Sequence, residues 1–500
     1  MRSVVTPRHL FLGVFFLGTA FLVSLVPVGG GDTWWYLATG RFIAETGGVP
    51  AGDPFSFTAP GAPWVNPEWL TNLFFFLVYR AGGFEALFAL KVLLTGMLLG
   101  LAFFRLRKRC ASDGGALLGV TLLALGISGY IDIRAQLFTF LLTLLAYFVL
   151  ETSRPFFLQV LGIAAITALW ANLHGGFALM FLWGGMHFVA ACFPGPSPVG
   201  KSSPGRALIL LGAAFGGSLL TPYGLSLYHN TLPYLLMLLG ALVGSAQWAL
   251  PQTLEWISPL RTDVPGFTTP LFWIALGFLA WRLVLRRHEF SRFDLLRGMA
   301  LGGMALASRR FIPLFFLAAG DLFAPGTSDE AAPAKAPRAF PAAGWGLLAL
   351  LLLFLGVRAV PDFRSSLTRG FFYHTTIQEA FPDAACNFLR AQGLSGRIFN
   401  DYNWGGFLLW QLFPPSTVFV DGRIQTVYPP EILLERQALE AGQNWEEICR
   451  RRNVEIMVLS PHLEGHLVRL ANASGNWRIL FEDARSVVLI RRDLEKNMTP

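Results

Sequence analysis

The chain has 500 residues, of which 54% are hydrophobic and only 14% are charged. Soluble domains carry about 25% charged residues, so this composition excludes an ordinary soluble protein and predicts a chain that crosses a membrane many times. A formal net charge of +8 in a soluble chain would suggest nucleic acid as a partner. Here the basic residues gather in short loops between apolar runs, as cytoplasmic loops do, so the sequence predicts membrane lipids around the chain and no nucleic-acid partner.

The first apolar run, 10–28, follows Arg2 and Arg8. Positive charge stays on the cytoplasmic side, and a span needs about 20 apolar residues. Because no small-residue cleavage site follows, the run predicts an uncleaved span. This span places the N-terminus in the cytoplasm and residues 29–72 in the first extracytoplasmic loop.

Later apolar runs predict the remaining crossings. Residues 69–79 are apolar but short and end near a glycine pair at 82–83, so they predict a helix lying along the membrane. The next span, 84–104, stops at a basic cluster, 105–109. Because such a cluster stays in the cytoplasm, it sets the direction in which each span is predicted to cross the membrane. Nine further spans are predicted, at 116–128, a fourth ending near 153, 157–170, a sixth ending near 194, 207–220, 270–285, 295–307, 311–323 and 344–357. The total is about eleven.

Residues 232–250 are also apolar enough to cross. A crossing there would place Arg282 and Arg286 outside, against the charge bias. The segment is therefore interpreted as interfacial or re-entrant, which membrane proteins tolerate where such backbone packs on protein. A true crossing remains the alternative.

The composition changes near residue 358, which divides the chain into a transmembrane domain, 1–358, and an extracytoplasmic α/β domain, 359–500. Strand-like runs alternate there with helix-like runs at 382–390 and 430–441, a pattern that favours a small α/β sheet. The strands are predicted at 397–400, 417–420, 455–459, 478–481 and 486–490. Cys386 and Cys449 could pair in an oxidising compartment or remain buried thiols.

The first loop carries two acids beside aromatic residues. Asp32 follows the first span, and Glu68 precedes the next apolar run. Between them lie aromatics of the kind that prefer lipid headgroups, namely Trp34, Trp35, Tyr36 and Trp64, with Trp69 just beyond. We interpret the loop as a scaffold that holds two carboxylates at the membrane surface. In the simpler alternative, Asp32 is a first-turn helix acid and Glu68 caps a helix.

The predicted topology brings polar residues from separate segments to the outer ends of spans. Charged groups at membrane depth are costly and tend to mark function, so one shared pocket is expected. Its predicted members are Asp32, Glu68, Arg134, Gln136, Asn172, His174, Tyr223, Glu255, Arg309 and Arg310. Some have simpler interpretations, because His174 could close a turn and Tyr223 could be a packing aromatic.

Arg309 and Arg310 lie on the outer side, against the positive-inside bias, and Arg134 could join them or pair with Asp132. Guanidinium groups suit phosphate, so an anionic ligand is favoured over a snorkelling pair. The residue types would support transfer of a sugar from a lipid-phosphate carrier. A carboxylate would take the acceptor proton, and arginines would stabilise the departing phosphate. A divalent cation such as Mg²⁺ or Mn²⁺, held by Asp32 and Glu68, is an alternative source of that stabilisation.

An early acid in the first loop (GGGDTWWYLATG) and a later Pro-Glu before an interfacial helix (NPEWLTNLFFFLVYRAGG) are followed by an inward span that ends in Arg and Lys. This order resembles the GT-C class of membrane glycosyltransferases. That class includes protein O-mannosyltransferases, aminoarabinose transferases and oligosaccharyltransferase catalytic subunits. The resemblance implies eleven or more spans, a polyprenyl-phosphate-linked sugar donor and Asp32 as the catalytic base. Glu68 would match the second loop acid.

Two segments of the C-terminal domain, 400–406 and 420–423, are similar in placement to the Trp-Trp-Asp-Tyr-Gly element with which oligosaccharyltransferases read their acceptor. The resemblance implies an acceptor-side role for Asp401, Trp404, Asp421 and Arg423. Because this chain has one Trp and a displaced Asp, recognition of an Asn sequon does not carry over. Both acids could equally be turn residues at strand ends.

The sequence thus predicts a polytopic α-helical, GT-C-like inverting glycosyltransferase of a bacterial inner membrane, with its C-terminal α/β domain in the periplasm. Its acceptor, whether glycan, lipid or protein, is left open. The alternative is a non-catalytic carrier, flippase or assembly factor for lipid-linked glycans. A ligase that uses a diphosphate-linked polymer is a third interpretation.

Overall fold

The chain divides into two units, each built from an early and a late part of the sequence. One contains Met1–Pro27 and Leu87–Phe371, and we call it the helical unit. The other, the α/β unit, contains Val28–Ala86 and Phe372–Pro500. The predicted boundary after residue 358 stays a prediction. The computed structural model describes residues 7–25, 31–110, 112–151, 155–193, 203–228, 256–261, 269–323, 341–369, 380–424 and 426–495.

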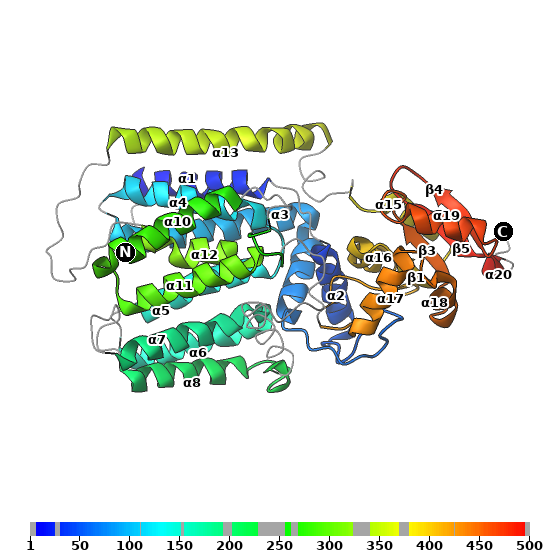
Figure 1. The fold of residues 1–500 in the computed structure, drawn as a ribbon, viewed down its shortest axis with the longest axis horizontal. Coiled ribbons are helices and arrows are strands. Elements are labelled where there is room, and N and C mark those ends of the chain that lie inside the picture. The colour runs from blue at the N-terminus through cyan, green and yellow to red at the C-terminus, as the bar shows by residue number, and fades with distance from the viewer. Residues whose placement is uncertain are drawn as a thin grey trace. The chain divides into compact units, whose positions relative to one another are not determined.

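A helix occupies each predicted span of the helical unit, in the predicted order (Figure 1). The α-helices are α1 (Pro7–Ser24), the second part of α3 (Trp69–Arg109), α4 (Asp113–Ile127), α5 (Gln136–Leu150), α6 (Phe156–Leu173), α7 (Leu179–Cys192), α8 (Pro204–Ser218), α10 (Thr269–Leu285), α11 (Arg292–Ala307), α12 (Ile312–Ala319) and α13 (Ala342–Arg369). The 3₁₀ turns are η1 (Ser128–Tyr130), η2 (Gly175–Ala178), η3 (Arg287–Glu289), η4 (Arg309–Phe311) and η5 (Gly320–Phe323). Residues 232–250 lie outside the described part of the chain.

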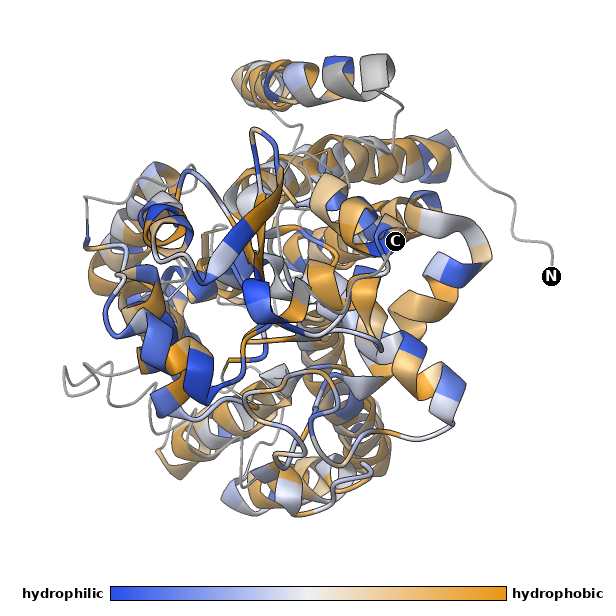
Figure 2. Ribbon diagram, turned by 90° about the vertical axis from the view of Figure 1, so that its right-hand side faces the viewer, coloured by the Kyte–Doolittle hydropathy of each residue, from blue (hydrophilic) through white to orange (hydrophobic). Residues whose placement is uncertain are grey.

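Several of these helices are long and apolar enough to cross a membrane, and Figure 2 shows that most of the helical ribbon is hydrophobic. Within the described residues they are Pro7–Ser24, Trp69–Lys108, Asp113–Tyr130, Phe156–Leu173, Gly175–Cys192 and Ala342–Pro361. Two shorter apolar helices lie at Gln136–Leu150 and Pro270–Leu285. The chain is a multi-pass helical membrane protein, whereas the count of about eleven crossings stays a prediction.

Local sequence explains where these helices begin and break. Ser112 accepts a hydrogen bond from the Gly115 N–H and starts α4, and Ser291 and Asp294 form a capping box at the start of α11. Within α3 the backbone leaves helical geometry at Gly82 and Gly83, and Gly83 has φ +67°. The predicted glycine break is confirmed, because a side chain rarely tolerates that conformation.

Buried ion pairs join helices of the helical unit. Arg297 is 1% exposed, and its Nη2 lies 2.8 Å from Asp294 Oδ1 and 2.9 Å from Asp321 Oδ2. Arg105 Nη2 lies 3.3 Å from Asp321 Oδ1 and 3.4 Å from Glu151 Oε1. Arg105, in the basic cluster predicted to end a span, is 4% exposed and lies between these two carboxylates.

The α/β unit contains a five-stranded sheet with the order β2-β1-β3-β5-β4. Its strands are β1 (Arg397–Asn400), β2 (Thr417–Val418), β3 (Ile456–Leu459), β4 (Trp477–Glu482) and β5 (Val487–Arg491). β1 is parallel to β2 and β3, and β5 is antiparallel to β3 and β4. The helices of the unit are α2 (Asp32–Thr46), the first part of α3, α15 (Asp383–Ala391), α16 (Gly405–Leu412), α17 (Pro430–Glu440), α18 (Trp445–Arg451), α19 (Gly465–Ala473) and α20 (Arg492–Glu495), with the turn η6 (Tyr402–Trp404). The predicted small α/β domain is confirmed.

The first loop extends this sheet beyond β2. Ser56 forms a parallel bridge with Val418, the Val418 N–H donates to the Phe55 carbonyl at 3.2 Å, and the Phe57 N–H donates to the Val418 carbonyl at 3.2 Å. Thr58 Oγ1 donates to the Phe419 carbonyl at 2.6 Å. Residues 55–58 and the C-terminal sheet therefore form one folded body.

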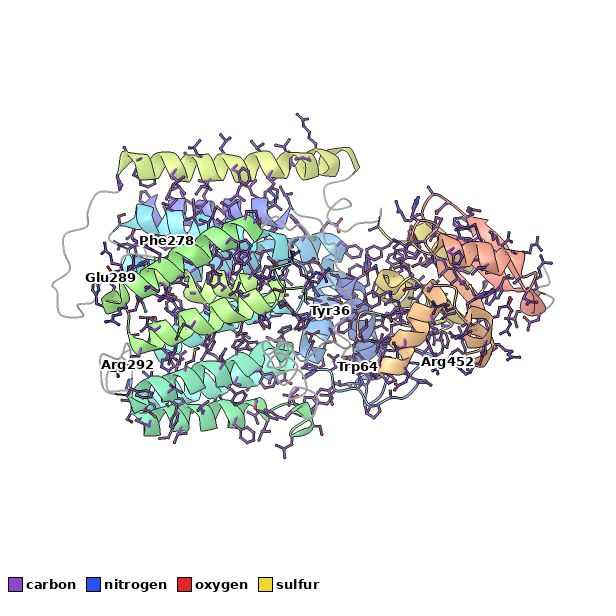
Figure 3. All side chains as sticks on the ribbon, in the orientation of Figure 1. Tyr36, Trp64, Phe278, Glu289, Arg292 and Arg452 are labelled. Atoms are coloured by element: carbon purple, nitrogen blue, oxygen red, sulfur yellow. The ribbon has the colours of Figure 1, made fainter. Side chains whose placement is uncertain are left out.

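The loop aromatics form the interior of the α/β unit. Trp34, Trp35, Tyr36 and Trp64 are 4%, 7%, 4% and 1% exposed, and Tyr36 and Trp64 are labelled in Figure 3. The Trp34 ring lies 4.8 Å from Phe407, edge to face. The expectation that these four aromatics meet lipid headgroups is corrected, because protein atoms cover them. Cys386 and Cys449 are buried free thiols, which settles the alternative left open by the sequence.

Candidate functional site

Asp32 is the first residue of α2 and lies half-buried in the α/β unit. An acid in the first helical turn is favoured by the helix dipole. The Trp35 indole Nε1 donates to Asp32 Oδ1 at 3.1 Å, so the next turn of the same helix fixes the carboxylate. The predicted base therefore has a defined orientation.

Gly422 lies directly against this carboxylate. A Cβ atom built on Gly422 would lie 2.6 Å from Asp32 Oδ1 and 3.0 Å from Trp35 Nε1. A Cβ atom on Gly406 would lie 2.7 Å from the Gly31 carbonyl oxygen. Only glycine fits at these points, because the C-terminal backbone approaches the start of α2 too closely for a side chain.

A buried ion network holds the loop that contains Gly422. Arg423 Nη1 donates to Asp53 Oδ1 at 2.6 Å, and its Nε and Nη2 donate to the two oxygens of Asp421 at 2.8 and 2.6 Å. Tyr428 donates its hydroxyl to Asp421 Oδ2 at 2.7 Å. Burial alone would lower the pKa of Arg423, but Asp421 and Asp53 outweigh it and hold that pKa above its ordinary value.

Aromatic faces complete the surroundings of Arg423, whose guanidinium carbon lies 4.6 Å from the Trp64 ring centre and 4.9 Å from that of Phe55. Asp421 and Arg423 were predicted to lie on the acceptor side. Both side chains are fully buried, so in this structure they bind each other and shape the loop beside Asp32. The sequence analysis missed Asp53, because nothing local distinguishes it from a turn acid.

Glu68 immediately precedes α3 and is half-buried. Its N–H donates to Asn66 Oδ1 at 3.0 Å, and its carbonyl accepts from the Asn72 N–H at 2.9 Å. Asp32 and Glu68 thus begin two helices of the same unit. Among the described residues no group of three or more His, Cys, Asp or Glu side chains could hold a metal ion, and the cation predicted at Asp32 and Glu68 stays a prediction.

Asp401 and Trp404 follow β1. Asp401 accepts from the Asn403 N–H at 2.7 Å, and Trp404 Nε1 donates to the Ala380 carbonyl at 2.9 Å. Both line a cavity of about 620 Å³. Two of the predicted acceptor-side residues are therefore brought together at one cavity.

In the helical unit, the structure gives His174 a defined tautomer. Its Nδ1 accepts from the Gly176 N–H at 2.9 Å and lies 2.7 Å from Thr139 Oγ1. Trp170 Nε1 donates to the same Thr139 oxygen at 2.8 Å. Since Nδ1 accepts the Gly176 N–H, the proton of the neutral ring is on Nε2, and the Thr139 hydroxyl donates to Nδ1.

Two of the predicted phosphate-site residues lie near this ring. His174 lies within electrostatic range of both Arg310 and Arg134. The Arg310 guanidinium lies 4.8 Å from the Trp256 ring centre, and Ser308 Oγ accepts from the Arg310 N–H. The helical unit therefore brings two cations to the half-buried turn that contains His174.

The other predicted pocket residues lie in less distinctive surroundings. Arg309 is 6% exposed and donates to the Arg261 carbonyl at 3.0 Å. Asn172 donates to the Ala168 and Leu220 carbonyls at 2.7 and 2.8 Å, so it ties α6 to the end of α8. Gln136 is the first residue of α5, Tyr223 lies half-buried in the turn after α8, and Glu255 lies outside the described residues.

No protein-family model and no curated protein matches this sequence. Solved structures do share its fold, and they are GT-C glycosyltransferases, which confirms the resemblance at the level of the fold. One is ArnT from Cupriavidus metallidurans bound to undecaprenyl phosphate, 12% identical with a TM-score of 0.53 over 97% of this chain and 98% of that one.

Another is the archaeal oligosaccharyltransferase AglB from Archaeoglobus fulgidus, in complex with an inhibitory peptide and a dolichol-phosphate. It is 14% identical, with a TM-score of 0.51 over 92% of this chain and 70% of that one. The Archaeoglobus fulgidus oligosaccharyltransferase in complex with Zn and sulfate is 14% identical, with a TM-score of 0.50 over 91% of this chain and 69% of that one.

Proposed function

We propose that this chain is a membrane glycosyltransferase that moves a sugar from a polyprenyl-phosphate carrier to an acceptor. The observation that carries the proposal is the fold shared along nearly the whole length of ArnT. ArnT and AglB are bound to polyprenyl phosphates in their structures. Such a carrier would be the donor here.

In the proposed reaction an acceptor hydroxyl or amine attacks the anomeric carbon of the donor sugar. Asp32 takes the acceptor proton as the new bond forms, and the bond from the sugar to the phosphate oxygen breaks. The leaving group is the polyprenyl phosphate. A single displacement of this kind inverts the configuration at the anomeric carbon, and Glu68 is assigned as the second acid of the loop.

The donor phosphate is assigned to Arg134, Arg309 and Arg310. Guanidinium groups hold phosphate through paired hydrogen bonds and stabilise charge that grows on it as the sugar leaves. The clustering of Arg134 and Arg310 around His174 supports this assignment. The sugar transfer is assigned to the outer face of a bacterial inner membrane, with the C-terminal sheet in the periplasm.

The alternative is a carrier, flippase or assembly factor that binds the same lipid without chemistry. Purified protein in lipid nanodiscs, supplied with polyprenyl-phosphate sugars and mixed acceptors, distinguishes the two. An enzyme releases polyprenyl phosphate in step with glycosylated acceptor, measured by mass spectrometry. A carrier binds the donor and returns it intact, which would refute the proposal.

A further inference from the structure

The cavity beside Asp401 opens at one edge of the C-terminal sheet. Asp401, Asn403 and Trp404 follow β1, and Ser460, His462 and Leu463 follow β3. β1 and β3 are parallel neighbours, so their carboxyl ends meet at the same edge. The remaining lining residues are Gly31, Ala380, Phe381, Ala484 and Arg485.

The cavity lies at a point in the strand order of the sheet that favours ligand binding. β1 has β2 on one side and β3 on the other, so the connection from β1 to β2 and the return from β2 to β3 run in opposite directions. Open α/β sheets bind ligands in the crevice outside the carboxyl ends of such strands. A volume of about 620 Å³ lies within the range of small-molecule sites.

Carboxyl groups occupy the backbone donors that a phosphate would need at this edge. The Asn403 N–H donates to Asp401 Oδ1 at 2.7 Å, and the Ser460 N–H donates to Glu464 Oε2 at 2.8 Å. A phosphate binds where backbone N–H groups are free to donate to it. A neighbouring carboxylate repels it, because both carry negative charge. These two N–H groups therefore offer no phosphate site, although Arg485 also lines the cavity.

Asp401, which lines the cavity, forms a buried pair with Glu464. They are 3% and 4% exposed, and their side chains are hydrogen-bonded. Burial and the charge of Asp401 raise the pKa of Glu464 to about 8. At neutral pH Glu464 therefore keeps its proton, and its hydroxyl donates a hydrogen bond to Asp401.

Besides Asp401, Arg485 and His462, the polar side chains around the cavity are neutral and lie beside aromatic rings. Asn403 and Ser460 supply an amide and a hydroxyl, and Trp404 and Phe381 supply ring surfaces. A strongly cationic ligand is disfavoured, because Arg485 also lines the wall. The lining groups therefore suit a ligand that has many hydroxyl groups and an apolar ring face.

We propose that this cavity binds a neutral saccharide, with the carboxylate of Asp401 accepting from its hydroxyls and Trp404 or Phe381 packing against a ring. If the chain is the proposed transferase, this saccharide is part of the acceptor. That role rests on the proposed function, whereas the binding itself does not.

The test is saturation-transfer NMR on the full-length protein in detergent, with methyl glucoside, methyl mannoside and methyl N-acetylglucosaminide as probes. At least one neutral glycoside should show transfer that falls at least fivefold in Asp401→Asn and in Asn403→Ala. Asn403 is exposed, so its variant should keep the fold. Glu431→Gln, an exposed change on α17, should leave transfer unchanged.

Unchanged binding in both cavity variants, no binding of any neutral glycoside, or stronger binding of glucose 6-phosphate would each overturn the saccharide site. Arg310→Ala separates this cavity from a donor site, since it should leave glycoside binding intact. Sugar binding without any transfer would refute the proposed function alone. Transfer with an unchanged acceptor KM in Asn403→Ala would refute the acceptor role.

Discussion

Arg423 donates to Asp53 at 2.6 Å, although 370 positions separate the two residues in the sequence. Both side chains are fully buried. This pair joins the segment between α2 and α3 to the C-terminal part of the chain within one folded unit. The loop that carries Asp32 is therefore shaped by residues near the other end of the chain.

Arg423→Met should destabilise the α/β unit by about 3–5 kcal/mol, because it leaves Asp53 and Asp421 as uncompensated buried charges. The measurement is the thermal unfolding of the full chain in detergent. Arg451→Met is the matched control: Arg451 pairs with Glu435 at 2.9 Å but is 53% exposed, so it should change stability by less than about 1 kcal/mol. Equal losses in the two variants would contradict the structural role of Arg423.

Gly422→Ala should lower the transfer rate while leaving the protein folded. Its Cβ atom would press against Asp32 Oδ1 and Trp35 Nε1, and a displaced catalytic group of this kind costs on the order of 10- to 100-fold in rate. The check is a transfer assay alongside a thermal midpoint. Gly48→Ala, where a Cβ atom meets nothing within 4 Å, should keep full activity, and equal activity in both variants would argue against Asp32.

The stability of the α/β unit should fall as pH rises from 4.5 to about 8. The pKa of Glu464 is raised in the folded state from its ordinary 4.5 to about 8, so the folded chain holds a proton that the unfolded chain releases in this window. The contribution of Glu464 to the free energy of unfolding is fully present below pH 4.5 and is lost as the pH passes 8. Thermal midpoints measured from pH 5 to 9 should decline, and the slope should flatten in Glu464→Gln but not in Glu431→Gln.

Thr139→Val should destabilise the helical unit, because the Thr139 hydroxyl serves both Trp170 Nε1 and His174 Nδ1. Leaving the buried indole N–H without an acceptor costs about 1–3 kcal/mol. Thr139→Ser keeps the hydroxyl and should retain most of the stability. The comparison is the thermal midpoint of the two variants, and a Ser variant as unstable as the Val variant would argue against the hydrogen bonds.

Local patterns predicted much of the fold. Short alternating runs bounded by turn residues located all five strands, and charge at the ends of apolar runs located the helices in order. The Gly82 and Gly83 break was also visible, because adjacent glycines in an apolar run interrupt a helix.

Long-range relationships could not be predicted from such patterns. The local sequence around Arg423 and Asp53 gives no sign of their ion pair. Trp34 and Trp64 have the sequence context of interfacial aromatics, but in the folded chain other segments bury them. Likewise, nothing in the local sequence marks Arg105 as a buried residue. The burial and the ion pairs of these residues depend on segments that lie far away in the sequence.

The proposal depends most directly on Asp32. Polyprenyl-phosphate release and donor binding should both be measured for the unaltered chain and for Asp32→Asn in nanodiscs. We expect release to fall at least 100-fold while donor binding stays within twofold, since the amide cannot take the acceptor proton. Release at the unaltered rate in Asp32→Asn would contradict the assignment of Asp32 as the base.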